Sequence, residues 1–247
     1  MTHIETNGAI IENKTYTGDT GAFDVHADGR PYHTFRTQTV LADGDNIIFR
    51  SCRFENKARP DRGQAIALYL DGDDIICEDC ELYGWQDTLF LAPLPPKEYE
   101  KDGFLGPKEH TPRTPRSYHF RNCLICGTVD FIFGGAAAVF ENCEFRSMGA
   151  GYVFAPCTPQ GAEYGFIARN CTFTAAEGVP DESVYIARPW REYAQVRLEN
   201  CRLDRHIHRQ GWHDWGKAVH DTVRFEEYGS YGEGAVMSCR HDYIITG

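Results

Sequence analysis

The sequence predicts an all-β protein built as a single-stranded parallel β-helix. A short segment centred on a cysteine recurs six times, at spacings of 28, 43, 20, 28 and 30 residues. Repeats with such periods indicate stacked coils. Turns rich in glycine and proline (24 and 12 residues), together with little helical periodicity, favour short strands over helices within each coil.

Each repeat combines two short strands with a bend between them, as in "NIIFRSCRFEN" and "FIARNCTFTA". The apolar positions lie five and three residues before the cysteine, then at the cysteine and two residues after it. A flat strand would keep a strict period of two. The alternation of inward and outward side chains shifts by one residue at a Ser, Asp or Asn. Asn and Asp tolerate a left-handed backbone. We therefore expect a one-residue bend before each of six stacked interior cysteines: Cys52, Cys80, Cys123, Cys143, Cys171 and Cys201.

Composition predicts one domain and limits the classes of partner. The 247 residues are 42% hydrophobic, enough for a single core over residues 1–247. A net charge of −11 argues against nucleic acid or an anionic membrane as partner. No apolar run is long enough to cross a bilayer. No signal peptide is visible, and ten thiols suit a reducing compartment, so we expect a cytoplasmic protein, or a secreted one if the N-terminus has been trimmed.

Cysteines and histidines raise the question of a metal site. Cys77 with Cys80, and Cys123 with Cys126, have a spacing common in zinc sites. Four other coils carry a cysteine at the repeat position without such a partner, so a structural role explains more of the pattern. The segment "DRHIHRQGWHDW" is interpreted as a solvated basic loop rather than a metal site, and its histidines are His206, His208 and His213. We expect no metal and no cofactor.

Two carboxylates occupy one offset in neighbouring coils. Asp87 and Asp130 each lie seven residues after a repeat cysteine, and Gly84 and Gly127 each lie four residues after it. Equivalent positions in adjacent coils stack roughly 4.8 Å apart. The intervening stretch, about 91–117, must then be a loop, which its Pro, Gly and Lys content supports. The run "GTVDFIFGG" around Asp130 otherwise has the composition of a buried strand.

Close carboxylates cannot both ionise comfortably, because the pKa of one rises while the other stays low. The spacing therefore predicts an acid paired with a nucleophile or base. A retaining glycosidase would use a similar spacing, and a carboxyl ladder that fills space or binds a cation is the non-catalytic alternative. The residues alone do not decide which type of bond is cleaved.

Several motifs resemble those of the pectin methylesterase (pectinesterase) family. "GQAIALYLDGDDIICEDCELYGWQDTLF", "CGTVDFIFGGAAAVFENC" and "ARPWREY" resemble its three signatures, and "GWHDW" and "EEYGSYGEGA" resemble later, weaker ones. They occur in order over roughly residues 40–240, and the loop containing "PLPPKE" resembles bacterial members. The resemblance implies a right-handed parallel β-helix that hydrolyses galacturonosyl C6 methyl esters to carboxylate and methanol.

The resemblance also implies roles for individual residues. Asp130 would be the nucleophile that forms an acyl-enzyme, and Asp87 the general acid and then base. Arg188 would pair with Asp130, and Gln64 and Gln86 would donate hydrogen bonds to the oxyanion.

Aromatic side chains would line the sugar-binding groove; the candidates are Trp190, Phe90, Phe133 and Trp212. The expected partner is a methyl-esterified galacturonan oligomer or polymer, whereas the oligomeric state is left open. The charge of −11 predicts a preference for neutral esterified stretches, with free carboxylates tolerated only where a basic residue faces the groove.

Three departures from the family pattern affect these expectations. The N-terminal and C-terminal caps are shortened, and "YVFAPCTPQGAEYG" stands where the family more often has Thr-Ala-Gln-Gly. The alternatives are an esterase or thioesterase of the same fold acting on another acyl group, a catalytically silent uronate-binding β-helix, and a glycosidase.

Overall fold

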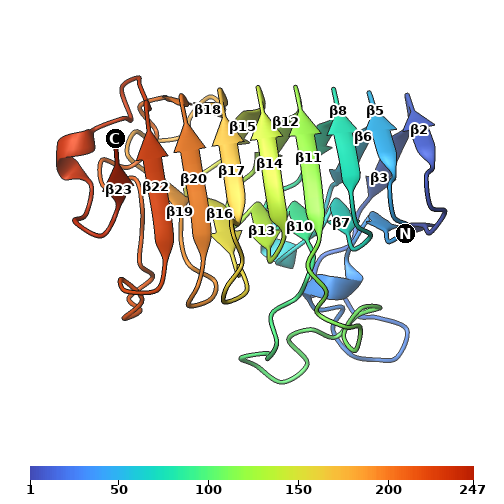
Figure 1. Ribbon diagram of the computed structural model, residues 1–247. Helices are drawn as coiled ribbons and strands as arrows, with labels where there is room; N and C mark the ends of the chain where they lie inside the picture. The colour runs from blue at the N-terminus through green and yellow to red at the C-terminus, as the bar shows by residue number, and fades with distance from the viewer.

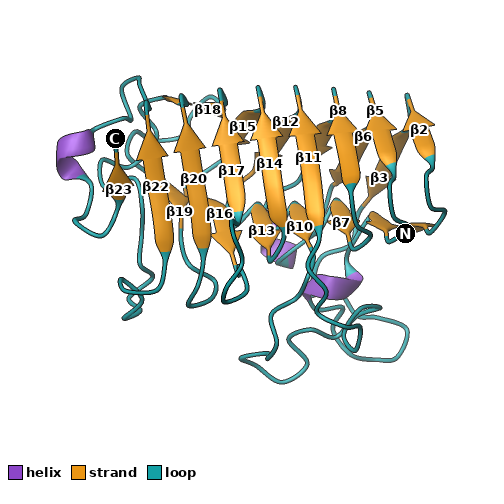
Figure 2. Ribbon diagram, in the orientation of Figure 1, coloured by secondary structure: helices purple, strands orange, loops and turns teal.

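The computed structural model describes all residues 1–247 and contains three parallel β-sheets. Its only helical segments are three 3₁₀ turns, η1 (Thr34–Arg36), η2 (Pro60–Arg62) and η3 (Met237–Cys239). None of its helices has the length and hydropathy needed to cross a membrane. The all-β prediction is confirmed (Figure 2).

Successive strands pass from sheet A to sheet B to sheet C and then begin the next coil, except that the last two strands both join sheet B. Sheet A contains β1 (Thr2–Ile4), β4 (Val40–Ala42), β7 (Leu68–Leu70), β10 (Leu89–Leu91), β13 (Ile132–Gly134), β16 (Gly151–Pro156) and β19 (Val184–Ala187). Sheet B contains β2 (Ile10–Glu12), β5 (Ile48–Arg50), β8 (Ile75–Glu78), β11 (Ser117–Arg121), β14 (Ala137–Glu141), β17 (Phe166–Arg169), β20 (Gln195–Glu199), β22 (Arg224–Tyr228) and β23 (Ile245–Thr246). Sheet C contains β3 (Thr15–Gly18), β6 (Arg53–Asn56), β9 (Glu81–Tyr83), β12 (Leu124–Gly127), β15 (Glu144–Ser147), β18 (Thr172–Ala175) and β21 (Arg202–Leu203). The coils wind in a right-handed sense from the N-terminal to the C-terminal end (Figure 1), which is the predicted parallel β-helix.

The predicted bend before each repeat cysteine is present in all six coils. The residue there has a φ of 50° to 55°, in the left-handed region that Asn and Asp adopt most easily among residues with a side chain. These residues are Ser51, Asp79, Asn122, Asn142, Asn170 and Asn200. The bend turns the chain from sheet B into sheet C and resets which side chains point inward.

The six repeat cysteines lie inside the coil as small apolar residues, each at most 2% exposed. Backbone hydrogen bonds link neighbouring coils; for example, Glu144 N donates to the carbonyl of Cys123 at 2.9 Å. All ten cysteines are free thiols. Cys80 and Cys123 thus take the same structural position as the four repeat cysteines that lack a CxxC partner.

Two apolar clusters stabilise the coil on opposite sides of sheet A. The interior contains stacked rings such as Phe120 on Phe140, with centroids 4.8 Å apart. Burial of such side chains contributes roughly 1.5–3 kcal/mol each. A second cluster covers the outer face of sheet A, where loop 19–39 brings Phe35 against Phe90 and Phe133, and loop 92–116 brings Phe104 against Phe35. This outer cluster forms the floor beneath the site described below.

The interpretation of "DRHIHRQGWHDW" as a solvated loop is wrong for His206. Its side chain is 2% exposed, and neither ring nitrogen has a hydrogen-bond partner. The cause is pairing of the next residue, Ile207, with Val184 of β19, which brings this segment into the wall of the coil. His206 is therefore a buried imidazole, and its protonation is linked to the stability of the folded protein.

Acid is expected to destabilise the wild-type protein more than a His206→Leu variant. Burial lowers the pKa of His206 to about 4, from an ordinary value of 6.5. Because the folded-state pKa lies below the unfolded one, the unfolded state gains the proton first, and stability falls as the pH drops through this interval. The linkage amounts to roughly 2–3 kcal/mol between about pH 7.5 and about pH 4.5.

Urea unfolding at both pH values measures this loss, with His110→Leu as the matched control because His110 is exposed. The control should show the wild-type pH dependence. Equal acid sensitivity of the wild type and His206→Leu would contradict the assignment.

Candidate active site

Two equivalent turns between sheet C and sheet A position the predicted pair of carboxylates. A Cβ atom at Gly127 would lie 2.1 Å from Cβ of Phe131 and 2.8 Å from the carbonyl oxygen of Trp85. One at Gly84 would lie 2.5 Å from Oγ1 of Thr88. Only glycine allows the chain to turn this tightly, which explains why both turns start with it.

Asp87 and Asp130 occupy adjacent coils at the same register, as their offset predicts. Asp87 N donates to the carbonyl of Val129 at 3.1 Å, and two residues later Leu89 pairs with Ile132. No strand lies between β10 and β11, so the predicted loop is confirmed.

The strand-like run around Asp130 is not one continuous strand. Strand β13 begins only at Ile132, and Asp130 lies in the preceding bend with a φ of 51°. Asp87 has a φ of 64°. Aspartate is among the residues that adopt this conformation with least strain, so the bend accommodates the backbone of each carboxylate.

Arg188 reaches Asp130 across one intervening coil. It follows β19 directly, and the corresponding residue in β16 is Ala155, whose small side chain leaves room for the guanidinium. Arg188 Nε and Nη2 donate to the two carboxylate oxygens of Asp130 at 2.8 and 2.6 Å. The guanidinium lies between two rings, 4.2 Å from the centroid of Tyr152 and 3.9 Å from that of Trp215. Planar stacking with a bidentate ion pair requires arginine rather than lysine.

The environments of the two carboxyl groups separate their protonation states. Burial and then the charge of Asp130 raise the pKa of Asp87 well above its usual range. Burial also raises the pKa of Asp130, but the Arg188 hydrogen bonds and charge oppose that rise. Asp87 therefore holds a proton more strongly, while Arg188 favours the ionised form of Asp130. The repeat spacing predicts such a difference in proton affinity between two neighbouring carboxyl groups.

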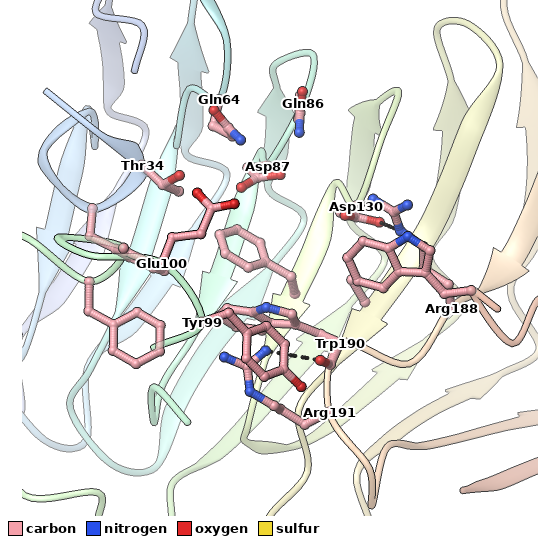
Figure 3. A pocket seen from close by; sticks show the side chains of 16 residues that line it. Thr34, Gln64, Gln86, Asp87, Tyr99, Glu100, Asp130, Arg188, Trp190 and Arg191 are labelled. Carbon is pink, nitrogen blue, oxygen red and sulfur yellow. Dashed lines mark hydrogen bonds and ion pairs between the residues drawn. The ribbon is translucent and has the colours of Figure 1, made fainter. Parts of the chain in front are cut away.

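A cavity of about 370 Å³ opens above this pair (Figure 3). Gln64 and Gln86 line it beside Asp87, as predicted, and the Asp130–Arg188 pair lies next to them. The cavity is lined by Thr34, Phe35, Gln64, Gln86, Asp87, Tyr99, Glu100, Gly103, Phe104, Asp130, Phe133, Ala155, Arg188, Trp190, Arg191 and Trp215. The site thus combines a carboxylate paired with an arginine, a second carboxyl group whose pKa is raised, and two amides.

The aromatic predictions divide into two groups. Phe133 and Trp190 line the cavity, with ring centroids 5.8 Å apart. Phe90 does not, because it is fully buried between Phe35, Tyr69 and Phe133 and supports the floor from beneath.

Trp212 was also expected in the groove, and this is corrected. It is fully buried, stacks on Phe225 at 4.9 Å, and its indole N–H donates to Glu227 at 3.0 Å. Trp215, three residues later in "GWHDW", lines the cavity instead. Trp215 is partly exposed and has a φ of 58°, whereas Trp212 of the same motif is fully buried.

Sequence reasoning also missed several other side chains of the site. Tyr99 and Glu100 come from the long loop, where nothing in the composition distinguishes them. Arg191 follows the Arg-Pro-Trp motif directly, and Lys217 follows Trp215 by two residues, so proximity to a motif was the available signal. Tyr152 belongs to the divergent "YVFAPCTPQGAEYG" segment and pairs with Tyr185 in the next coil. Its contact with Arg188 places that segment beside the site.

Comparisons with known proteins agree with this architecture. The family model described as Pectinesterase matches residues 9–94 and 111–244. A protein named Pectinesterase from Petunia integrifolia is 32% identical over 248 residues, covering 95% of this chain and 60% of that protein. This chain spans about half to three-fifths of the length of such curated relatives.

Two solved structures share the fold. The pectin methylesterase PemA from Erwinia chrysanthemi is 24% identical with a TM-score of 0.78, covering 99% of this chain and 80% of that one. A pectin methylesterase in complex with a hexasaccharide is 23% identical with a TM-score of 0.76, covering 98% and 81%. At these sequence identities, the similarity to the two solved structures supports the parallel β-helix fold. The assignment of this chain to a family rests on the family model instead.

Proposed function

Because this chain belongs to the pectinesterase family, we propose that it hydrolyses C6 methyl esters of galacturonosyl units to carboxylate and methanol. The observation that carries the proposal is the bidentate Arg188–Asp130 pair beside a buried Asp87, at one wall of a cavity lined by two glutamines. An ionised nucleophile and a protonated acid in one site suit acyl transfer.

In the first half-reaction, a carboxylate oxygen of Asp130 attacks the carbonyl carbon of the ester. The carbonyl oxygen becomes an oxyanion, which accepts hydrogen bonds from the amides of Gln64 and Gln86; loss of one such donor typically costs ~10²–10³ in rate. The intermediate collapses as the bond to the methoxy oxygen breaks. Asp87 gives its proton to that oxygen, and methanol leaves a mixed anhydride on Asp130.

In the second half-reaction, Asp87 is ionised and acts as a base. It takes a proton from a water molecule, whose oxygen attacks the acyl carbon of the anhydride. The bond from that carbon to Asp130 breaks, which restores the Asp130 carboxylate and the protonated Asp87. The released uronic acid then ionises in solvent. The same two carboxyl groups thereby complete the cycle.

The aromatic rings of the cavity support a sugar oligomer as the substrate. Phe133, Trp190 and Trp215 present apolar faces around the carboxylate pair. A solved member of the same fold was obtained in complex with a hexasaccharide, which supports an oligosaccharide ligand here. We propose that methyl-esterified galacturonan occupies this cavity with its reacting ester above Asp130.

The test is incubation of the wild-type protein with methyl-esterified oligogalacturonate, with methanol and new reducing ends measured in parallel. We expect methanol without new reducing ends. New reducing ends would indicate a glycosidase instead. Absence of methanol, with binding retained, would favour a silent uronate-binding protein or an esterase for a different acyl group.

A further inference from the structure

Two aromatic rings pack on the guanidinium of Arg188, and one short segment of the chain contacts or contains both of them. The ring centroid of Tyr152 lies 4.2 Å from the guanidinium carbon, and that of Trp215 lies 3.9 Å from it. Trp215 belongs to residues 213–217, called the 213–217 turn below. The first two residues of this turn, His213 and Asp214, do not line the cavity. Their contacts nevertheless lead to Arg188, one to each ring.

His213 holds the ring of Tyr152. Its backbone N–H donates to the carbonyl of Ala187 at 3.0 Å, which fixes the start of the turn next to Arg188. Nδ1 of His213 and the hydroxyl of Tyr152 share a hydrogen bond of 3.2 Å, and the two rings stack with centroids 5.6 Å apart. Tyr152 extends from β16 and its hydroxyl forms no other side-chain hydrogen bond. His213 is therefore the polar anchor of the ring that packs on the guanidinium.

Asp214 holds the indole of Trp215 through the backbone. Trp215 has a φ of 58° and Gly216 a φ of 65°, both in the left-handed region. This conformation is unfavourable for a bulky side chain, so surrounding contacts must maintain it. Oδ1 of Asp214 accepts the N–H of Gly216 at 2.8 Å, and Oδ2 lies 3.1 Å from Nε2 of His220. Nζ of Lys217 ties the end of the turn to two backbone carbonyls, at 2.9 and 3.2 Å.

The two rings restrain the orientation of the guanidinium, on which the ion pair with Asp130 depends. Nε and Nη2 of Arg188 donate to separate carboxylate oxygens at 2.8 and 2.6 Å, and this bidentate geometry is lost when the guanidinium rotates. Burial raises the pKa of Asp130, and the hydrogen bonds and charge of Arg188 oppose that rise. A poorly oriented guanidinium would oppose it less, so a larger fraction of Asp130 would be protonated at a given pH.

We propose that His213 and Asp214 are positioning residues for Arg188. Each acts through one aromatic ring on the guanidinium, and the oriented guanidinium keeps the Asp130 carboxylate ionised for its attack on the ester. This rests on the function proposed above.

Three other titratable groups face the Asp130–Arg188 pair. Asp87 comes from the preceding coil, Tyr152 from β16 and Lys217 from the end of the 213–217 turn. Substitutions at His213 and Asp214 leave all three in the chain. Removal of the negative charge of Asp214 would by itself lower the pKa of Asp130, which is opposite to the change expected from a loosened guanidinium.

The pH dependence of kcat/KM for methanol release tests the proposal. His213→Leu and Asp214→Leu should each move the acid limb to higher pH by about half a unit, which lowers kcat/KM about threefold on that limb, with a smaller loss well above it. His213→Asn and Asp214→Asn retain an acceptor oxygen and should keep the wild-type profile. A substitution that only weakened the fold would lower activity by the same factor on both sides of the limb.

Two further variants separate the contact from the neighbouring aromatic group. Tyr152→Phe removes only the hydroxyl, so it should reproduce the shift of His213→Leu, and the double variant should shift no further. The matched control is His208→Leu. His208 stacks on Tyr185 with centroids 4.4 Å apart but forms no hydrogen bond with Tyr152, and its replacement should leave the profile unchanged.

An acid limb that stays in place in both leucine variants, or that moves as far in the asparagine variants, would overturn the proposal. A shift in only one leucine variant would overturn it for the other residue. Titration of the Asp130 carboxyl group by ¹³C NMR, with Asp130→Asn to assign its signal, gives the same test without turnover. Its apparent pKa should rise by about half a unit in the leucine variants.

The two proposals fail separately. Methanol release by the wild type, combined with an unaltered Asp130 titration in both leucine variants, would disprove the positioning role and leave the esterase function standing. Absence of methanol from every substrate would disprove the function, and the NMR titration would still decide whether His213 and Asp214 control the ionisation of Asp130.

Discussion

An Asp130→Asn variant is expected to lose methanol release by at least about 10⁴-fold in kcat, because it removes the carboxylate that we propose forms the acyl-enzyme. The amide has nearly the shape of the carboxylate but is not a nucleophile at neutral pH. Asparagine also tolerates the φ of 51° at this position, so the bend should be preserved. The measurement is methanol release from methylated oligogalacturonate, with circular dichroism and thermal unfolding as checks of the fold.

Asp74→Asn is the matched control for this variant. Asp74 has a φ of 52° in a comparable bend but is exposed and outside the cavity. Its replacement should leave kcat unchanged. Activity of Asp130→Asn within tenfold of the wild type would remove Asp130 from the mechanism and point to Asp87 or another group as nucleophile.

The second large effect is expected from Arg188→Met, which should lower kcat/KM about 10³-fold at neutral pH. Burial already raises the pKa of Asp130, and Arg188 is the main group that opposes this rise. Without the guanidinium the pKa of Asp130 rises further, so more of the nucleophile is protonated at a given pH. The acid limb of the pH–activity profile should therefore move to higher pH, with part of the activity recovered in alkali.

Measurement of kcat/KM over about pH 5–9 tests this expectation. Arg188→Lys serves as the comparison, because it keeps a positive charge but loses the bidentate geometry and the stacking between Tyr152 and Trp215. It should lie between the wild type and Arg188→Met. An acid limb that stays in place in Arg188→Met would show that Arg188 does not control the ionisation of Asp130.

The fold was predictable because its rules are local and repeated. A bend residue before an interior cysteine recurs in six coils, and each bend has the same left-handed backbone conformation. Asp87 and Asp130 were predictable for the same reason, since equal offsets from a repeated cysteine become neighbouring positions in the coil. Arg188 lies two coils further along, and the family resemblance rather than the repeat identified it.

Side chains at irregular positions were less predictable. Trp212 and Trp215 belong to one motif, but one donates to buried Glu227 and the other faces the cavity. His206 was expected in solvent and lies in the wall of the coil because its neighbour pairs with β19. In each case the decisive partner is distant in sequence, so local composition carries no information about it.

The sequence by itself determined the parallel β-helix, its single-residue bends and the register of the two carboxylates, because stacking converts a repeated offset into proximity. Only the tertiary structure decided which loop residues complete the cavity. Tyr99 and Glu100 reach it because residues 92–116 fold over sheet A, and Arg191 and Lys217 share the Trp190 carbonyl because two separate loops converge there. Those contacts depend on chain paths between the repeats, where the periodic pattern that specifies the coil is interrupted.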